Sequence, residues 1–153
     1  MAVETLAELF LHDLSLMMDA ERQNSRLLLL LAGTIENEPV QSLLRLHEPE
    51  TVQQIRNIER CFQILNVEPT SVVSEVPRAL KSELHTFMQH TQSNMILTAY
   101  ILTAAVKSEQ YEISSYQLLL RQAAALGHDT IKPLLQQNLE QEEAMAQRIR
   151  QIS

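Results

Sequence analysis

The stretch VETLAELFLHDLSLMMDAERQNSRLLLLLA, residues 3–32, decides the fold. Its inward positions recur every three or four residues, which is the spacing of one face of an α-helix. The stripe comprises Leu6, Phe10, Leu14, Met17, Glu21, Asn24, Leu28 and Leu31. The sequence therefore predicts one long amphipathic helix, closed by Gly33 in a left-handed conformation.

A second helix is predicted to follow after a short turn at residues 34–38. It begins near Pro39, because proline is tolerated in the first turn of a helix, and extends to about residue 65. Pro49 lies inside this stretch. An interior proline removes a backbone donor and clashes with the preceding turn, so a kink or break is expected near Glu48.

The second half of the chain shows a similar arrangement of two helices. Residues 93–126 predict a long helix closed by Gly127, and Asp129 is expected to cap the last helix. The intervening residues 66–77 are typical of a linker, and residues 78–88 predict a short amphipathic helix. Two hairpins joined by one long crossover have the connectivity of ferritin-like bundles. The predicted fold is an all-α, ferritin-like four-helix bundle in a single domain, residues 1–153.

Composition supports this fold class and excludes several functions. The 153 residues include 45% hydrophobic and 20% charged residues but only two glycines, as expected of one compact helical domain. The net charge of −7 opposes nucleic acid as a partner. Cys61 is the single cysteine and is interpreted as a core residue in a reducing compartment. Residues 1–10 do not fit a secretory signal and the apolar residues 95–106 are too short to span a bilayer, so we expect a cytoplasmic protein without a membrane partner.

Five glutamates interrupt stripes that are otherwise mostly apolar: Glu21, Glu50, Glu109, Glu112 and Glu142. Counted from the turns, they fall at similar heights, since each helical residue advances about 1.5 Å. Several carboxylates cannot stay ionised together in a dry interior unless protons or a cation compensate them. Inward glutamates from four helices are the usual ligands of dinuclear iron or manganese sites. The spacing therefore indicates such a site at these five residues.

Structural roles for the same glutamates remain open at this point. Glu109 and Glu112 could lie on a flank of their helix and pair with Lys107 or Arg121. A neutral Glu112 could also bond the hydroxyl of Tyr116 one turn later. Spacing alone favours neither these roles nor the metal site. A protein without any cofactor is therefore the alternative to the dinuclear metal protein.

Neighbouring polar residues add little to the metal hypothesis. The Glu-x-x-His pairs typical of di-iron bundles are absent at these heights. His47 faces inward and is interpreted first as a satisfied core histidine, with a role as ligand or donor as the alternative. Gln54 could hydrogen-bond Glu50. No phosphate-binding loop or serine nucleophile motif is present, so the residues do not decide whether the chain is an enzyme.

Four segments resemble the YciF-like family of bacterial ferritin-like stress proteins. The most specific is EQYEISSY, residues 109–116, which is similar to the family's run Glu-His-Tyr-Glu-Ile-Ala-x-Tyr. DAERQ at residues 19–23, Glu50-Thr51 and LEQEE at residues 139–143 resemble the other segments, in the same order. The resemblance implies a bundle that is often dimeric and linked to stress responses. It also implies a dinuclear carboxylate site at Glu21, Glu50, Glu109, Glu112 and Glu142.

The chain departs from this pattern at four positions: Pro49, Val52, Gln110 and Ala146. These departures remove imidazole and one acidic residue from the expected ligand region, so the site could be degenerate. Two functions follow from the residues. The first is a dinuclear carboxylate protein that handles iron, manganese or reactive oxygen. The second is a metal-free bundle that serves as an assembly or protein-binding module.

The outer face of the third long helix is unusually apolar. Met95, Leu97, Ile101 and Leu118 remain there after the inward face is assigned. Exposed apolar patches of this kind usually mark contacts with other proteins. We therefore expect a homodimer or higher homo-oligomer, or an additional protein partner that the sequence does not identify.

Overall fold

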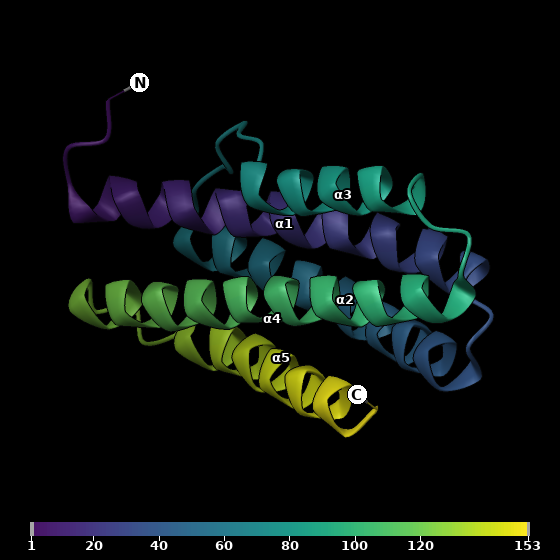
Figure 1. Ribbon diagram of the computed structural model, residues 1–153. Helices are drawn as coiled ribbons and strands as arrows, with labels where there is room; N and C mark the ends of the chain where they lie inside the picture. The colour runs from purple at the N-terminus through teal and green to yellow at the C-terminus, as the bar shows by residue number, and fades with distance from the viewer. Residues whose placement is uncertain (1, 153) are drawn as a thin grey trace.

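The computed structural model describes residues 2–152, and within them the chain forms five α-helices and no strand (Figure 1). The helices are α1 (Leu6–Thr34), α2 (Glu38–Leu65), α3 (Glu75–Met88), α4 (Asn94–Ala125) and α5 (Lys132–Ile152). The all-α prediction is confirmed. No helix in this described part combines the length and apolar character that crossing a bilayer requires.

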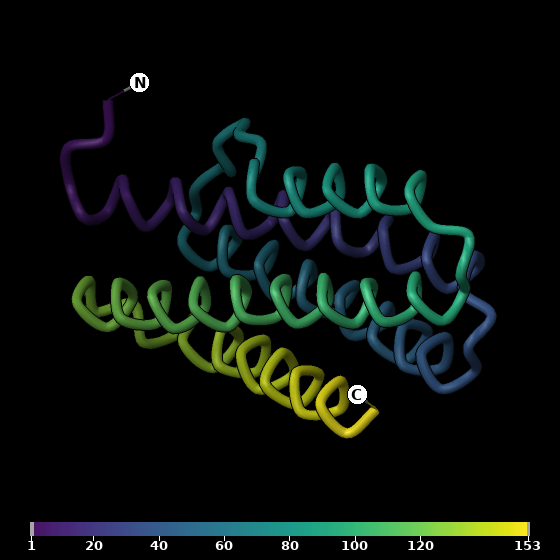
Figure 2. The backbone as a smooth tube through the Cα atoms, in the orientation of Figure 1, coloured from purple at the N-terminus to yellow at the C-terminus, as the bar shows by residue number. Residues whose placement is uncertain are grey.

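The four long helices form a closed bundle made of two antiparallel hairpins (Figures 1 and 2). Helix α1 packs along α2 and α4 packs along α5, while α2–α5 and α1–α4 contacts join the two hairpins. The crossover carries α3, which lies outside this ring against α1 and α4. This is the predicted ferritin-like arrangement with a short extra helix.

Side chains and special backbone conformations mark the helix ends. Thr5 and Glu8 form a reciprocal capping box at α1, and Asn37 and Ser93 accept bonds from backbone amides at the starts of α2 and α4. Gly127 follows the end of α4 as predicted and adopts a left-handed φ of 71°. Asn66 takes the same role after α2, with a φ of 54°.

The prediction for Gly33 is wrong. This residue lies inside α1, which continues to Thr34 and ends at Ile35 in an extended conformation. The Gln41 side chain of α2 donates to the carbonyl oxygens of Ala32 and Ile35 at 2.9 and 3.2 Å. Because a neighbouring helix binds these carbonyl groups, no left-handed residue is needed there.

Of the kink or break predicted near Glu48, the break does not occur, since α2 runs without interruption from Glu38 to Leu65. Pro49 and Arg45 are both exposed. The Arg45 carbonyl group, which has lost its helical donor, therefore lies on the side of the helix where water can hydrate it.

Two helix starts differ from the predictions. Helix α3 begins at Glu75 rather than at residue 78, and α5 begins at Lys132 rather than just after Asp129. The Asp129 carboxylate lies 3.5 Å from Lys132 Nζ, so it pairs with a side chain instead of serving as the expected backbone cap.

The core has two apolar ends separated by a polar layer. One end contains Phe10, Leu14, Ile58, Cys61, Leu119 and Leu135, which confirms Cys61 as a core residue. The other contains Leu31, Val40, Leu44, Leu84 and Ile101. In α1, α2 and α4 the inward glutamates or His47 lie between these two ends. In α5, Glu142 lies between Leu135 of the first end and a smaller third cluster that contains Met145 and Ile149. The fold thus encloses the polar layer in apolar surroundings.

The predicted outer apolar face is only partly present. Met95 and Leu118 have exposed fractions of 76% and 53%, as expected for such a face. Ile101 is only 2% exposed and belongs to the same cluster as Leu84 of α3. The crossover helix therefore covers part of the surface that sequence periodicity assigned to solvent.

Candidate metal centre

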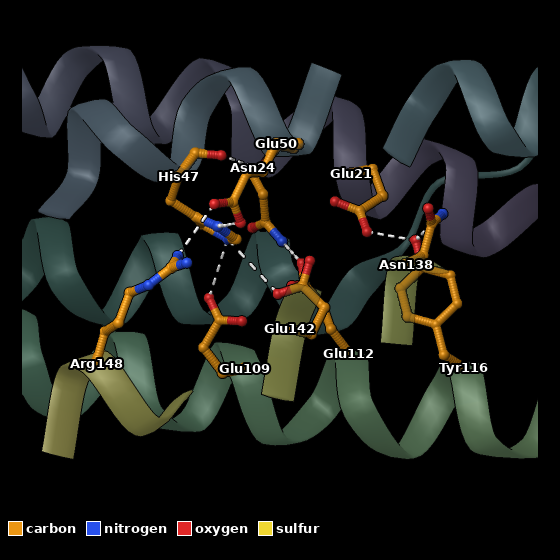
Figure 3. Close-up of polar contacts among 11 residues, drawn as sticks. Glu21, Asn24, His47, Glu50, Glu109, Glu112, Tyr116, Asn138, Glu142 and Arg148 are labelled. Atoms are coloured by element: carbon orange, nitrogen blue, oxygen red, sulfur yellow. Dashed lines mark hydrogen bonds and ion pairs between the residues drawn. The ribbon is translucent and has the colours of Figure 1, made fainter. Parts of the chain in front are cut away.

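Three helices bring four potential metal ligands together in the polar layer. His47 comes from α2, Glu109 and Glu112 from α4, and Glu142 from α5, and all four side chains are buried. One ligand atom from each lies within 4.8 Å of the others (Figure 3). Three of the five predicted site residues therefore meet in one cluster, together with a histidine that was not among them.

The local sequence explains why these side chains converge. Glu109 and Glu112 are three residues apart, so they project from the same face of α4. Helix α5 packs against both α4 and α2, which brings Glu142 beside the carboxylates of α4 and the imidazole of His47.

His47 stands at the centre of this arrangement. Its Nε2 atom lies 3.3 Å from Glu109 Oε1 and 3.5 Å from Glu142 Oε2, and its Nδ1 atom lies 3.5 Å from Glu50 Oε2. Burial acts to lower the pKa of His47, but the contact with Glu50 and the neighbouring negative charges outweigh it and raise the pKa. The prediction of a core histidine is therefore correct about the burial of His47, but it did not include the acidic side chains around it.

Burial also controls the protonation of the glutamates. It raises the pKa of Glu109 to about 7, and it raises the pKa of Glu21, Glu112 and Glu142 well above the ordinary value. Repulsion from neighbouring carboxylates adds to the rise for each of the last three. Without a cation, the site therefore holds protons that exposed glutamates would release near neutral pH.

Glu21 lies apart from the four-residue cluster and is held by a chain of hydrogen bonds (Figure 3). The Tyr116 hydroxyl donates to Glu21 Oε1 at 2.5 Å, and Asn138 Nδ2 donates to that hydroxyl at 3.1 Å. Asn57 in turn donates to Asn138 Oδ1 at 2.7 Å. The second carboxylate oxygen of Glu21 is buried and has no hydrogen-bond partner in the described part of the chain.

Glu50 lies at the edge of the site, where its side chain is 19% exposed. Arg148 of α5 donates to Glu50 Oε1 at 3.0 Å. The contact with His47 lowers the pKa of Glu50 more than burial raises it, and Arg148 lowers it further. This carboxylate is therefore already compensated by a guanidinium group on its outer side.

The structural roles that the sequence left open are not the ones observed. Glu109 and Glu112 are 4% and 1% exposed, so neither lies on a solvent flank as pairing with Lys107 or Arg121 requires. Glu112 Oε1 accepts a hydrogen bond from Asn24 of α1, while the Tyr116 hydroxyl binds Glu21 instead.

The proposed bond between Gln54 and Glu50 is likewise absent. Gln54 is fully buried, and neither polar atom of its side chain has a hydrogen-bond partner among residues 2–152.

Comparison with known proteins places the chain in a family. Residues 5–153 match the family described as "Domain of unknown function (DUF892)". The chain belongs to the DUF892 family. It is also 32% identical over 145 residues to protein YciF of Escherichia coli strain K12, covering 94% of this chain and 87% of that protein. The resemblance to YciF-like proteins is thereby confirmed.

Solved structures agree with this assignment to DUF892. The crystal structure of the Escherichia coli stress protein YciF matches with a TM-score of 0.93 at 30% identity, over 98% of this chain and 95% of that one. YcfI from Rhodopseudomonas palustris matches with a TM-score of 0.94 at 28% identity, over 99% and 96%. The bundle and its crossover are therefore shared across these proteins.

Proposed function

We propose that this chain is a stress-related protein that binds divalent iron or manganese in the polar layer of its bundle. The observation that carries the proposal is a set of buried carboxylate oxygens that have no hydrogen-bond partner within residues 2–152. They include both side-chain oxygens of Glu142 and the Oε2 atoms of Glu21 and Glu109. Such oxygens are costly in a dry core, and a cation satisfies several of them at once.

The donor set suits these metals. Carboxylate oxygens with imidazole nitrogen are ligands that iron and manganese accept, and no thiolate lies in the four-residue cluster. Ligand atoms about 2.0–2.2 Å from one ion lie at most about 4.4 Å apart. The observed limit of 4.8 Å means that small side-chain shifts would let His47, Glu109, Glu112 and Glu142 hold an ion.

A second ion, as in a dinuclear centre, would draw on Glu21. Its Oε2 atom, which has no hydrogen-bond partner within residues 2–152, could bind an ion, whereas its Oε1 atom accepts a hydrogen bond from Tyr116. Glu112 would have to give up its bond from Asn24. Glu50 is the weakest candidate among the five predicted ligands, because Arg148 already compensates its charge. When bound, such ions would supply redox or Lewis-acid chemistry, and the residues assign no particular reaction.

One observation favours the alternative, a metal-free bundle that acts as an assembly or protein-binding module. Protein groups already contact every glutamate of the layer: Tyr116 for Glu21, Asn24 for Glu112, Arg148 for Glu50, and His47 for Glu109 and Glu142. Carboxyl groups that stay protonated in these contacts would need no cation.

Metal analysis of purified protein separates the two functions. We expect about one to two iron or manganese ions per chain after expression in metal-supplemented medium and purification without chelators. The double variant Glu109→Gln/Glu142→Gln keeps side-chain size but removes two anionic ligands, so it should lose the metal. Glu140→Gln/Glu143→Gln changes two exposed glutamates on α5 and is the matched control. Equal metal content in the wild type and the ligand variant would exclude metal binding at Glu109 and Glu142. The metal-free function would then be the one that remains.

We also propose that copies of the chain associate through exposed apolar side chains. Leu29, Leu30, Met95, Ile96 and Leu118 are each at least 45% exposed. Contact between copies would remove these side chains from water. Light scattering coupled to gel filtration would show a dimer or larger species, and a monomer at micromolar concentrations would contradict the proposal.

A further inference from the structure

A cavity lies between the crossover helix and the bundle and ends at the candidate metal centre. Its walls come mainly from apolar side chains of all five helices, among them Leu28, Leu44, Leu80, Leu84, Ile101 and Met145. His47 and Glu109, two of the four clustered ligands, also line it. Pro77, Leu80 and Leu84 of α3 supply part of the lining, so the crossover helix helps to close the space.

The size of the cavity limits what it can hold. Its volume is about 60 Å³. A water molecule needs roughly 10–15 Å³ on this scale, and a dry apolar cavity of about 150 Å³ is known to hold benzene or xenon. The space therefore suits a molecule of a few atoms and is too small for an aromatic ring, a sugar or a nucleotide.

The chemistry of the walls limits the occupant further. The uncharged polar side chains in the lining are Asn24 and Ser108, and Asn24 already donates its amide to Glu112. A water or peroxide molecule needs several hydrogen-bond partners and would find few along the apolar part of the cavity. An uncharged apolar molecule loses nothing by leaving water for this space.

We propose that this cavity is a binding site for a diatomic gas, dioxygen, and delivers it to the side of the centre formed by His47 and Glu109. The choice of dioxygen over other small gases rests on the proposed function, because iron or manganese at these ligands is what dioxygen would meet. The existence of the gas site rests only on the cavity and its lining.

Dioxygen is paramagnetic, so it broadens the NMR signals of nearby methyl groups and reports its own position. The experiment uses metal-free, methyl-labelled protein, compared under nitrogen and under pressurised dioxygen. We expect greater broadening for the methyl groups of Leu84 and Ile101 than for those of Ile58 and Leu135, which are equally buried outside the cavity. Equal broadening in the two sets would overturn the proposal.

A variant in which a larger side chain fills the cavity provides the second part of the experiment. Ala105 lines the cavity, so Ala105→Leu should occupy the space and abolish the extra broadening. Ala99→Leu adds the same atoms at an exposed position of α4 and should leave it unchanged. Extra broadening that persists in a folded Ala105→Leu protein would place the gas elsewhere and overturn the site. If Ala105→Leu does not fold, the smaller change Ala104→Val takes its place.

Because this experiment contains no metal, it separates the two proposals. If the NMR experiment shows dioxygen in the cavity but metal analysis finds no iron or manganese, the gas site stands and the proposed function is wrong. If metal analysis finds iron or manganese but the NMR experiment shows no extra broadening, the proposed function stands and the gas site is wrong.

Discussion

Tyr116 illustrates how single residues hold the polar layer in place. Its ring belongs to the apolar cluster at one end of the core, while its hydroxyl reaches Glu21 at 2.5 Å. Asn138 donates to the same hydroxyl oxygen, so the group is both donor and acceptor in a fully buried position. One side chain thus links the apolar core to a carboxylate of the candidate centre.

Tyr116→Phe should destabilise the metal-free protein by about 1–3 kcal/mol, because it removes the hydrogen-bond donor to buried Glu21. It also removes one of the two bonds donated by the Asn138 amide, which keeps its bond to the Gln54 carbonyl oxygen. Tyr100→Phe is the matched control, since Tyr100 is only partly buried and stacks its ring on Phe87. Urea unfolding followed by circular dichroism measures both. Equal unfolding midpoints for the two variants would show that the Tyr116 hydroxyl contributes nothing.

The sequence predicted which residues face the inside of the bundle. It was less successful in predicting which of their side chains contact each other. Counting from the turns places Glu21 level with Glu50 and Glu112 level with Glu142. The structure brings Glu112 and Glu142 into one cluster, whereas Glu21 and Glu50 lie outside it. Spacing along one helix gives no information on the rotation of the helix opposite. For this reason the only partner that spacing offers Tyr116 is Glu112 on its own helix, as one alternative, whereas Tyr116 binds Glu21 across the bundle.

At the scale of helices, the two glycines have opposite roles although both lie near helix ends. Gly33 is inside α1 and has open space where a Cβ atom would lie. Gly127 has the same open space but a φ of 71°, which other residues rarely adopt. The distinction depends on Gln41, a residue of the next helix that satisfies the end of α1, and this contact is not visible in local sequence.

Alanine substitutions should separate these roles. Gly33→Ala is expected to stabilise the protein by about 0.5–1 kcal/mol, because alanine loses less backbone entropy in a helix. Gly127→Ala is expected to destabilise it by about 1–2 kcal/mol, the cost of a left-handed conformation with a Cβ atom. Thermal unfolding of both variants provides the measurement. A stabilising effect at Gly127 would contradict the assigned backbone conformation.

At the scale of the molecule, the bundle encloses a layer of ionisable side chains between two apolar ends. Such a layer costs free energy unless protons or a cation compensate it. The layer therefore couples the stability of the whole bundle to pH and to metal. It also explains why the general fold was predictable while the function was not: apolar periodicity sets the bundle, whereas compensation of the layer depends on contacts between helices.

The metal-free protein should lose stability as the pH rises from about 5 to 8. The pKa of Glu109 is about 7 in the folded protein and near 4.5 when unfolded, so the folded state binds more protons in this window. The raised pKa values of Glu21, Glu112, Glu142 and His47 act in the same direction. Glu50, whose pKa is lowered, opposes this trend only at more acidic pH.

Urea unfolding at several pH values tests this dependence. Glu109→Gln should make the decline shallower, because it removes one group that titrates in the window. Metal-loaded protein should also show a weaker decline, since its ligands are already deprotonated. A free energy of unfolding that rises between pH 5 and 8 in the metal-free protein would contradict the buried, protonated layer.

In the proposed function, His47, Glu109, Glu112 and Glu142 hold a metal ion inside the bundle. The most direct measurement is an anomalous difference map, collected at the iron or manganese absorption edge from crystals loaded with that ion. We predict a peak inside the bundle, within bonding distance of His47 Nε2 and the carboxylates of Glu109 and Glu142. Fully loaded crystals with no peak there, or with peaks only at exposed carboxylates, would contradict the claim.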